Sequence, residues 1–168
     1  MKRSALNAAY LGVSQMKHEQ LQENAENGSP SSQMMLGHCF LIGKDGDGNA
    51  MPVNYEKAKY WLEKAEARGV RTASFLLGSI FEKGLGVEAD IPRAIGLYEK
   101  AAETGHIYAL LNLARIYAQG KGAPQNVELA CHWYTKVKDF ESEIEPSAHE
   151  GELRNFVAEA KAYLEKNG

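Results

Sequence analysis

The stretch "ASFLLGSIFEKGLGVEADIPRAIGLYEKAAETG", residues Ala73–Gly105, decides the fold because its pattern occurs three times in the chain. The segments "MMLGHCFLIGKDG", "FLLGSIFEKGLG" and "LLNLARIYAQGKG" share a leucine, a small residue, an aromatic ring and a glycine in the same order. Downstream of each segment an alanine recurs at Ala58, Ala94 and Ala130, which lie 36 residues apart. A recurrence of this length is typical of proteins built from stacked structural repeats.

Each repeat is predicted to contain two helices. In both halves of the repeat, apolar and small residues recur at steps of three and four, as in Ala58, Leu62 and Ala65, and this spacing places them on one face of a helix. A short polar residue stands four positions before each aligned alanine, where its side chain can accept a hydrogen bond from a first-turn N–H group. These predicted N-cap residues are Asn54, Asp90 and Asn126.

The glycines of "GLGVEAD", residues Gly84 to Asp90, contain the pattern G-x-G-x-x-A, which also occurs in dinucleotide-binding enzymes. In those enzymes a strand precedes the glycines and a helix follows them directly. Gly84 instead follows "FLLGSIFEK", which has helical periodicity. The glycines are therefore predicted to end one helix and turn the chain toward the next, without a bound nucleotide.

The repeated pattern resembles the Sel-one-like repeat, a relative of the tetratricopeptide repeat, over about residues 29 to 140. The resemblance implies an all-α fold, a right-handed α-solenoid of stacked helix pairs like the tetratricopeptide superhelix. It also implies a protein that binds other proteins without catalysis. Disulfides inside each repeat occur in cysteine-rich secreted members of the family, and this chain lacks that arrangement.

The repeats divide the chain into five predicted segments. Residues 1–28 form an N-terminal capping helix with a degenerate half repeat. Residues 142–168 form a C-terminal capping helix, which begins with the capping box Ser147-x-x-Glu150 and carries one apolar stripe. Between these caps lie repeat 1 with a loop insertion (29–69), repeat 2 (70–105) and repeat 3 (106–141). About three repeats are needed for stacking to build a continuous core.

The composition argues against several classes of partner. The 168 residues carry a formal net charge of −3, which provides no broad positive field for nucleic acid or an anionic membrane. The chain has no apolar run of membrane-spanning length and begins without a clear export signal, so a cytoplasmic protein is expected, with export as the alternative. Cys39 and Cys131 are predicted to lie too far apart for a disulfide, and this prediction fits a reducing compartment. No cofactor is expected.

The first repeat carries five extra residues, because Gly43 precedes Ala58 by 15 positions and the equivalent glycines precede their alanines by ten. From Asp45 to Glu56, four oxygen-bearing residues match positions of a calcium loop, although the glycine needed for its sharp turn is replaced by Ala50. A polar turn without metal is the favoured interpretation. The four calcium ligands of this alternative are Asp45, Asp47, Asn49 and Glu56.

The predicted function is that of a non-catalytic scaffold or adaptor that binds a partner protein or peptide in a concave groove. The alternatives are a calcium-binding or regulatory, immunity-type repeat protein that uses the Asp45–Glu56 loop, and an enzyme with a site assembled across repeats. In tetratricopeptide repeats the first helix of each unit lines the groove. By that analogy, the expected partner-binding residues are Met34, His38, Leu41, Phe75, Ser79, Glu82, Tyr108, Leu111 and Arg115.

Overall fold

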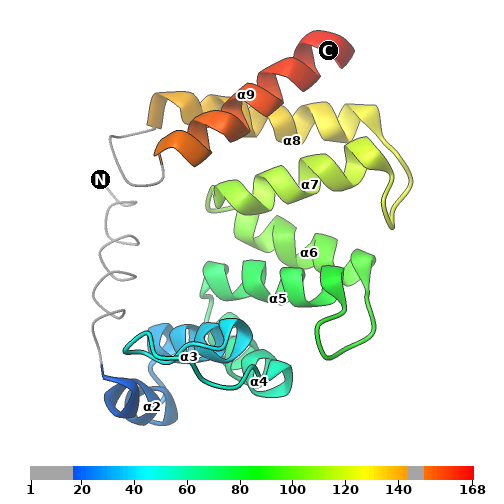
Figure 1. Ribbon diagram of the computed structural model, residues 1–168. Coiled ribbons are helices and arrows are strands. Elements are labelled where there is room, and N and C mark those ends of the chain that lie inside the picture. The colour runs from blue at the N-terminus through cyan, green and yellow to red at the C-terminus, as the bar shows by residue number, and fades with distance from the viewer. Residues whose placement is uncertain (1–16, 144–149) are drawn as a thin grey trace. The chain divides into compact units, whose positions relative to one another are not determined.

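The computed structural model describes residues 17–143 and 150–168, in which the chain forms eight α-helices and one 3-10 helix (Figure 1). The helices are α2 (His18–Glu26), α3 (Pro30–Ile42), α4 (Tyr55–Glu66), α5 (Arg71–Lys83), α6 (Ile91–Ala102), α7 (Ile107–Gln119), α8 (Val127–Asp139), η1 (Phe140–Glu143) and α9 (Glu150–Asn167). The predicted all-α class is confirmed, since the described residues add only an isolated bridge between Lys44 and Ala50. None of these helices is long and apolar enough to cross a membrane. The predicted N-terminal helix before residue 17 and the capping-box residue Ser147 lie outside the described residues.

The chain divides into two compact units between Ala89 and Asp90, and each is described separately. In the first unit α3 packs against α2 and α4, and α4 packs against α5. Apolar side chains of α2 and α3 form a buried cluster, against which Phe40, Met51 and Trp61 pack. Its members are Leu21, Ala25, Met35, Leu36 and Cys39.

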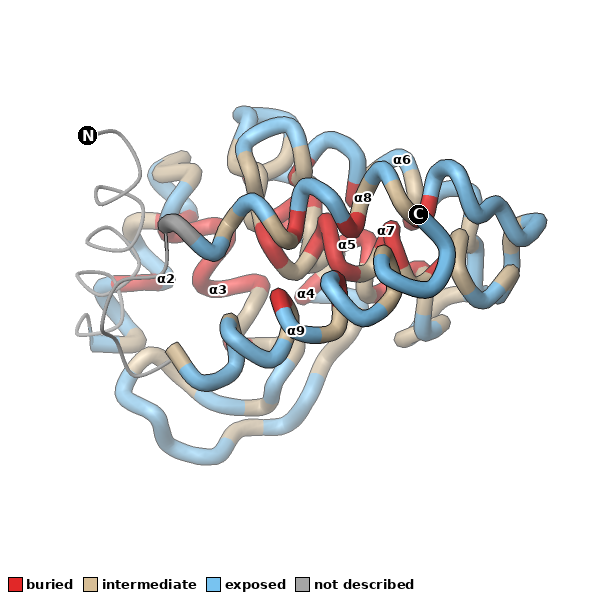
Figure 2. Tube along the Cα trace, turned by 90° about the horizontal axis from the view of Figure 1, so that it is seen from above, coloured by how far each residue is buried: buried red, intermediate tan, exposed pale blue. Residues whose placement is uncertain are grey.

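In the second unit α7 packs against α6 and α8, and α9 packs against α8. The core cluster draws on α7, α8 and α9. Its buried members are Leu110, Leu111, Ala114, Tyr134, Val137 and Ala160. Figure 2 shows the buried positions in red and the outward side of α9 in pale blue. The apolar stripe predicted for the last helix faces this core, because Val157 is buried and Phe156, Tyr163 and Leu164 pack against the cluster.

The predicted N-caps are present at the start of the second helix of every repeat. The Asn54 side chain accepts a hydrogen bond from the Lys57 N–H at 2.8 Å, and the Asp90 carboxylate accepts one from the Arg93 N–H at 2.9 Å. Asn126 caps α8 in the same way, through the N–H of Leu129 at 2.9 Å. These bonds satisfy donors that the first turn of a helix leaves unpaired.

The glycine pairs after the first helices end a helix, as the sequence predicts, and the structure shows that they also allow close packing. Gly84 ends α5 in the left-handed conformation, at φ 64°. Gly86 lies against the first residue of α4, so a Cβ at Gly86 would stand 2.6 Å from the Cβ of Tyr55. Gly122 repeats this contact, since its Cβ would stand 2.3 Å from Cγ1 of Ile91, the first residue of α6. The second glycine therefore lets each loop pack onto the start of the preceding repeat's second helix.

Candidate partner-binding surface

The partner-binding residues predicted on α3 differ in how far they are exposed. Met34 is buried, with 7% of its surface exposed, and belongs to the core. His38 and Leu41 are half-buried. Burial lowers the pKa of His38 below its ordinary value. On α3, the accessible part of the predicted surface is therefore reduced to His38 and Leu41.

On α5 the three predicted residues, Phe75, Ser79 and Glu82, are all half-buried. Between them, the helix turns Leu77, Ile80 and Phe81 into the core, where each is at most 4% exposed. The face that carries Phe75 and Glu82 thus offers an aromatic ring and a carboxylate beside the packed side of the helix. Both α3 and α5 belong to the first unit, so the structure places these five accessible residues in one compact body.

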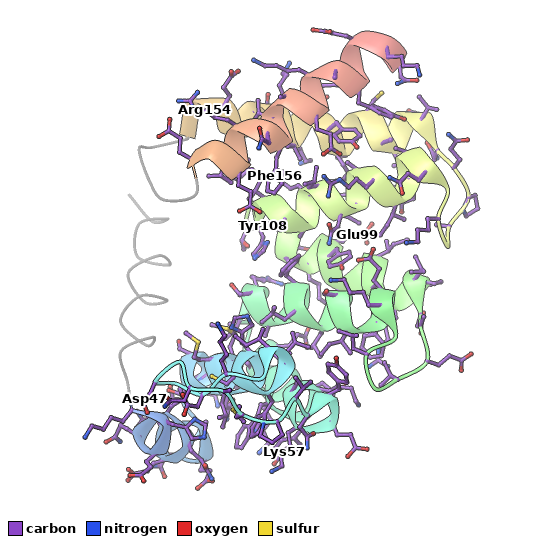
Figure 3. The ribbon with its side chains drawn as sticks, viewed as in Figure 1. Asp47, Lys57, Glu99, Tyr108, Arg154 and Phe156 are labelled. Atoms are coloured by element: carbon purple, nitrogen blue, oxygen red, sulfur yellow. The ribbon has the colours of Figure 1, made fainter. Side chains whose placement is uncertain are left out.

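The residues predicted on α7 lie in the second unit, where α9 takes up their interactions. Leu111 is 1% exposed and belongs to the core cluster. The Tyr108 hydroxyl donates to Glu152 Oε2 at 3.0 Å, and its ring meets the edge of Phe156 at a centroid distance of 5.4 Å (Figure 3). The α7 residues are therefore joined to the chain's own C-terminal helix.

Arg115 is held by the same helix. Its Nε donates to Glu159 Oε1 at 2.8 Å and its Nη2 donates to Glu159 Oε2 at 2.5 Å. Glu159 also accepts a hydrogen bond from the Tyr134 hydroxyl at 2.9 Å. The bond from Arg115 holds the pKa of Glu159 below its ordinary value, and burial together with Glu159 raises the pKa of Tyr134. The guanidinium of Arg115, expected to bind a partner, is thus hydrogen-bonded within the chain.

The insertion loop forms a turn that is closed by its own side chains. Oδ1 of Asp45 accepts hydrogen bonds from the N–H groups of Asp47 and Asn49, at 3.0 and 2.7 Å. Oδ2 of Asp45 accepts one from Nδ2 of Asn49 at 3.0 Å, and these bonds lower the pKa of Asp45. Asp47 accepts a bond from the backbone of His18, and Glu56 lies in the first turn of α4. Across the described ranges, His, Cys, Asp and Glu side chains form no group of three or more that could hold a metal ion.

A pocket of about 280 Å³, which the sequence does not predict, lies between α2, α3 and α4. Its wall carries four apolar or aromatic side chains and two polar ones. They are Leu36, Phe40, Tyr60, Trp61, Gln22 and Lys57. Figure 3 shows Lys57 on α4.

Trp61 and Trp133, which occupy the same position of their repeats, are only partly buried. Both pack against a core cluster, and a lysine lies over each ring: Lys64 Nζ is 5.4 Å from the Trp61 centroid, and Lys136 Nζ is 5.8 Å from the Trp133 centroid. The shared spacing Trp-x-x-Lys on α4 and α8 is the sequence signal that could have indicated a solvent-facing side of these rings.

Comparison with known proteins assigns the repeats to a family. The Sel1 repeat model matches residues 30–70, 72–106 and 107–136. A crystal structure of a Sel1 repeat protein from Oxalobacter formigenes superposes with a TM-score of 0.65 at 30% identity, over 73% of this chain and 89% of that chain. This match confirms the α-solenoid fold class.

Two curated relatives from eukaryotes are much longer than this chain. Chitin synthase regulatory factor 3 of Schizosaccharomyces pombe is 33% identical over 81 residues, which cover 48% of this chain and 8% of the relative. The ERAD-associated E3 ubiquitin-protein ligase component HRD3B of Arabidopsis thaliana is 30% identical over 132 residues, which cover 76% of this chain and 20% of the relative. The chain thus spans a fifth or less of either relative. With three matched repeats and a matching solved fold, the chain belongs to the Sel1 repeat family.

Proposed function

We propose that this protein is a non-catalytic interaction scaffold that binds a partner protein or peptide through the first helices of its first unit. The proposed surface, called the α3/α5 face, consists of His38, Leu41, Phe75, Ser79 and Glu82. The observation that carries the proposal is that these side chains stay half-buried while the neighbouring positions of both helices fill the core. A partly exposed aromatic ring beside polar groups suits an interface anchor.

The relatives support the same class of function. One is named a regulatory factor of chitin synthase and another a component of a ubiquitin ligase, and both names describe proteins that act on or with other proteins. The shifted pKa values of Arg115, Tyr134 and Glu159 also have a structural cause, since Arg115 and Tyr134 both donate hydrogen bonds to Glu159 across three helices. That cluster stabilises the packing of α9 and is not proposed as a catalytic site.

A pair of capture experiments tests the α3/α5 face. The immobilised full chain is used to capture partners, which mass spectrometry identifies, and the capture is repeated with Phe75→Ala combined with Glu82→Lys. We expect the partner to be lost, because truncating an interface anchor costs roughly 1–4 kcal/mol of binding free energy. The matched control combines Val127→Ala with Glu128→Lys on the exposed first turn of α8, and it should retain the partner. If a folded α3/α5 variant retained the partner fully, the binding surface would have to lie elsewhere on the protein.

We also propose that the protein works in a reducing, cytoplasmic compartment. Cys39 is buried and free, and Cys131 is free and partly exposed. Fractionation of cells that express the tagged full chain tests this location, and the protein is expected in the cytoplasmic fraction. Recovery of the protein outside that fraction would contradict the proposal.

A further inference from the structure

The pocket between α2, α3 and α4, called the α2/α4 pocket, is lined mainly by apolar and aromatic side chains. Leu36, which is 1% exposed, lines it together with the half-buried ring of Phe40. Tyr60, which is 52% exposed, meets Trp61 edge to face at a centroid distance of 5.1 Å, and both rings line the opening. An apolar side chain that entered this pocket would be surrounded by three aromatic rings and a leucine.

Two ammonium groups stand beside these rings. Lys57 Nζ lies 5.2 Å from the Phe40 centroid, and Lys64 Nζ lies 4.7 Å from the Tyr60 centroid. Within residues 17–143 and 150–168 the structure pairs neither Lys57 nor Lys64 with a carboxylate. The nearby Lys59 differs, because it pairs with Glu63 at 3.3 Å. Lys57 is the only charged residue among the described residues that line the pocket, and Lys64 lies over the rings of the lining residues Tyr60 and Trp61, so this side of the pocket's rim carries a positive charge.

The size and charge of the α2/α4 pocket select its occupant. A volume of about 280 Å³ is below the range of drug-sized ligand sites, roughly 300–1,000 Å³, and is sufficient for one large side chain. The positive rim favours carboxylates on either side of that chain. The chain's own residues 1–16 contain Lys2 and Arg3 and no acidic residue, so their charge does not complement the rim.

We propose that the α2/α4 pocket binds a linear peptide segment of a partner protein in which a large aliphatic side chain is flanked by acidic residues. The aliphatic side chain fills the space over Leu36 and Phe40, and the flanking carboxylates meet Lys57 and Lys64. This inference rests on the proposed scaffold function and adds a second surface, formed mainly by second helices of the repeats, to the α3/α5 face.

The chain's two tryptophans provide an internal test, because only Trp61 lines the pocket. The ¹⁵N-labelled full chain is titrated with the peptide acetyl-Glu-Glu-Leu-Glu-Glu-amide to millimolar concentration, and the two indole N–H signals are followed by NMR. The variant Trp133→Phe assigns them. We expect the Trp61 signal to shift with saturation while the Trp133 signal stays in place. An unmoved Trp61 signal, or an equal shift of both, would overturn the proposal.

Matched variants and peptides separate the pocket from non-specific attraction. Lys57→Gln combined with Lys64→Gln should weaken binding about fivefold to tenfold, since each cation contributes a modest, solvent-exposed interaction. Lys136→Gln, at the position on α8 equivalent to Lys64, should leave the affinity unchanged. Peptides with alanine in place of leucine, or lysines in place of glutamates, should bind more weakly. Equal binding of the lysine peptide, or equal weakening by Lys136→Gln, would contradict the model.

The outcomes distinguish this inference from the scaffold function itself. If the α3/α5 variant loses a captured partner and the Trp61 signal does not move, the scaffold function is supported and peptide binding in the α2/α4 pocket is contradicted. If the Trp61 signal shifts specifically and the α3/α5 variant captures the partner fully, peptide binding in the pocket is supported and the α3/α5 face is contradicted.

Discussion

Arg115 of α7 and Glu159 of α9 form a bidentate ion pair, in which Arg115 Nε lies 2.8 Å from Glu159 Oε1 and Nη2 lies 2.5 Å from Oε2. The Tyr134 hydroxyl donates to the same carboxylate from α8. One glutamate thus connects three helices of the second unit. Because α9 also buries Val157 and Ala160, this polar contact fixes the orientation of a helix that covers the core.

Arg115→Glu is expected to destabilise the fold. The sequence alone suggests a surface charge whose reversal leaves stability nearly unchanged, but the structure places the new carboxylate against Glu159. The side chains of Arg115 and Glu159 are 41% and 33% exposed, so solvent screening limits the cost to about 1–2 kcal/mol. Urea unfolding followed by circular dichroism measures this cost.

Two further variants test the origin of that loss. The double variant Arg115→Glu, Glu159→Arg should recover part of the stability, because it restores opposite charges in a double-mutant cycle. Arg154→Glu, which breaks the exposed pair with Glu150 one turn away on α9, should cost less than about 0.5 kcal/mol. Equal losses for Arg115→Glu and Arg154→Glu would contradict a special role for the first pair.

His106 is expected to make the protein sensitive to acid. Burial lowers the pKa of His106 from 6.5 to about 4, so between these values the unfolded chain binds the proton and the folded chain does not. The contribution of neutral His106 to the free energy of unfolding is fully present above about pH 6.5. It is lost as the pH falls toward 4, by up to about 3 kcal/mol. Urea unfolding at about pH 7 and about pH 4.5 measures the slope.

Variants identify the histidine responsible. His106→Gln should remove most of the loss of stability between about pH 7 and about pH 4.5. His132→Gln, at an exposed position of α8, should leave that loss unchanged. A smaller residual slope is expected from His38, whose pKa burial also lowers. An unchanged slope in His106→Gln would show that other groups control the acid response.

The helical architecture could be predicted because its signals are local and repeated. Asn54 and Asp90 cap helices three residues from their hydrogen-bond partners, so short-range sequence is sufficient to place the caps. Gly86 contacts Tyr55 of the preceding repeat, and the same contact recurs one repeat later between Gly122 and Ile91. Each local pattern is weak alone, and its recurrence in three repeats is what made the helices predictable.

The binding surface was harder to predict because burial depends on what packs over a helix. Arg115 and Glu159 are 44 residues apart, and α9 follows no repeat register that could indicate the pairing. Met34 and Leu111 share the helical position of Phe75, yet they are buried while Phe75 is not. The α2/α4 pocket likewise depends on the approach of Gln22 to Trp61, which only tertiary packing brings together.

The insertion loop is expected not to bind calcium. Both oxygens of Asp45 accept hydrogen bonds from the loop itself, so binding would have to break the bonds from Asp47 and Asn49. Position six of the loop also holds Ala50 where a calcium loop requires glycine. Calorimetric titration of the full chain should show no saturable heat at micromolar calcium. Tight binding that disappears in Asp45→Ala would contradict this expectation.

Two glycine-to-alanine substitutions are expected to change stability in opposite directions. Gly96 lies within α6 with no atom within 4 Å of an added Cβ, so Gly96→Ala should stabilise the protein by about 0.5–1 kcal/mol through helix propensity.

Gly37 lies within α3, where a new Cβ would stand 2.7 Å from Cγ of the fully buried Leu62 and 3.1 Å from the Ala58 carbonyl oxygen. Gly37→Ala gains the same propensity, but α3 and α4 must separate to make room, so a net loss of about 1–3 kcal/mol is expected. Thermal unfolding of both variants beside the parent chain measures the two effects. Gly96→Ala is the control, because it measures the effect of helix propensity alone. Stabilisation by Gly37→Ala would show that α3 and α4 are not closely packed at this point.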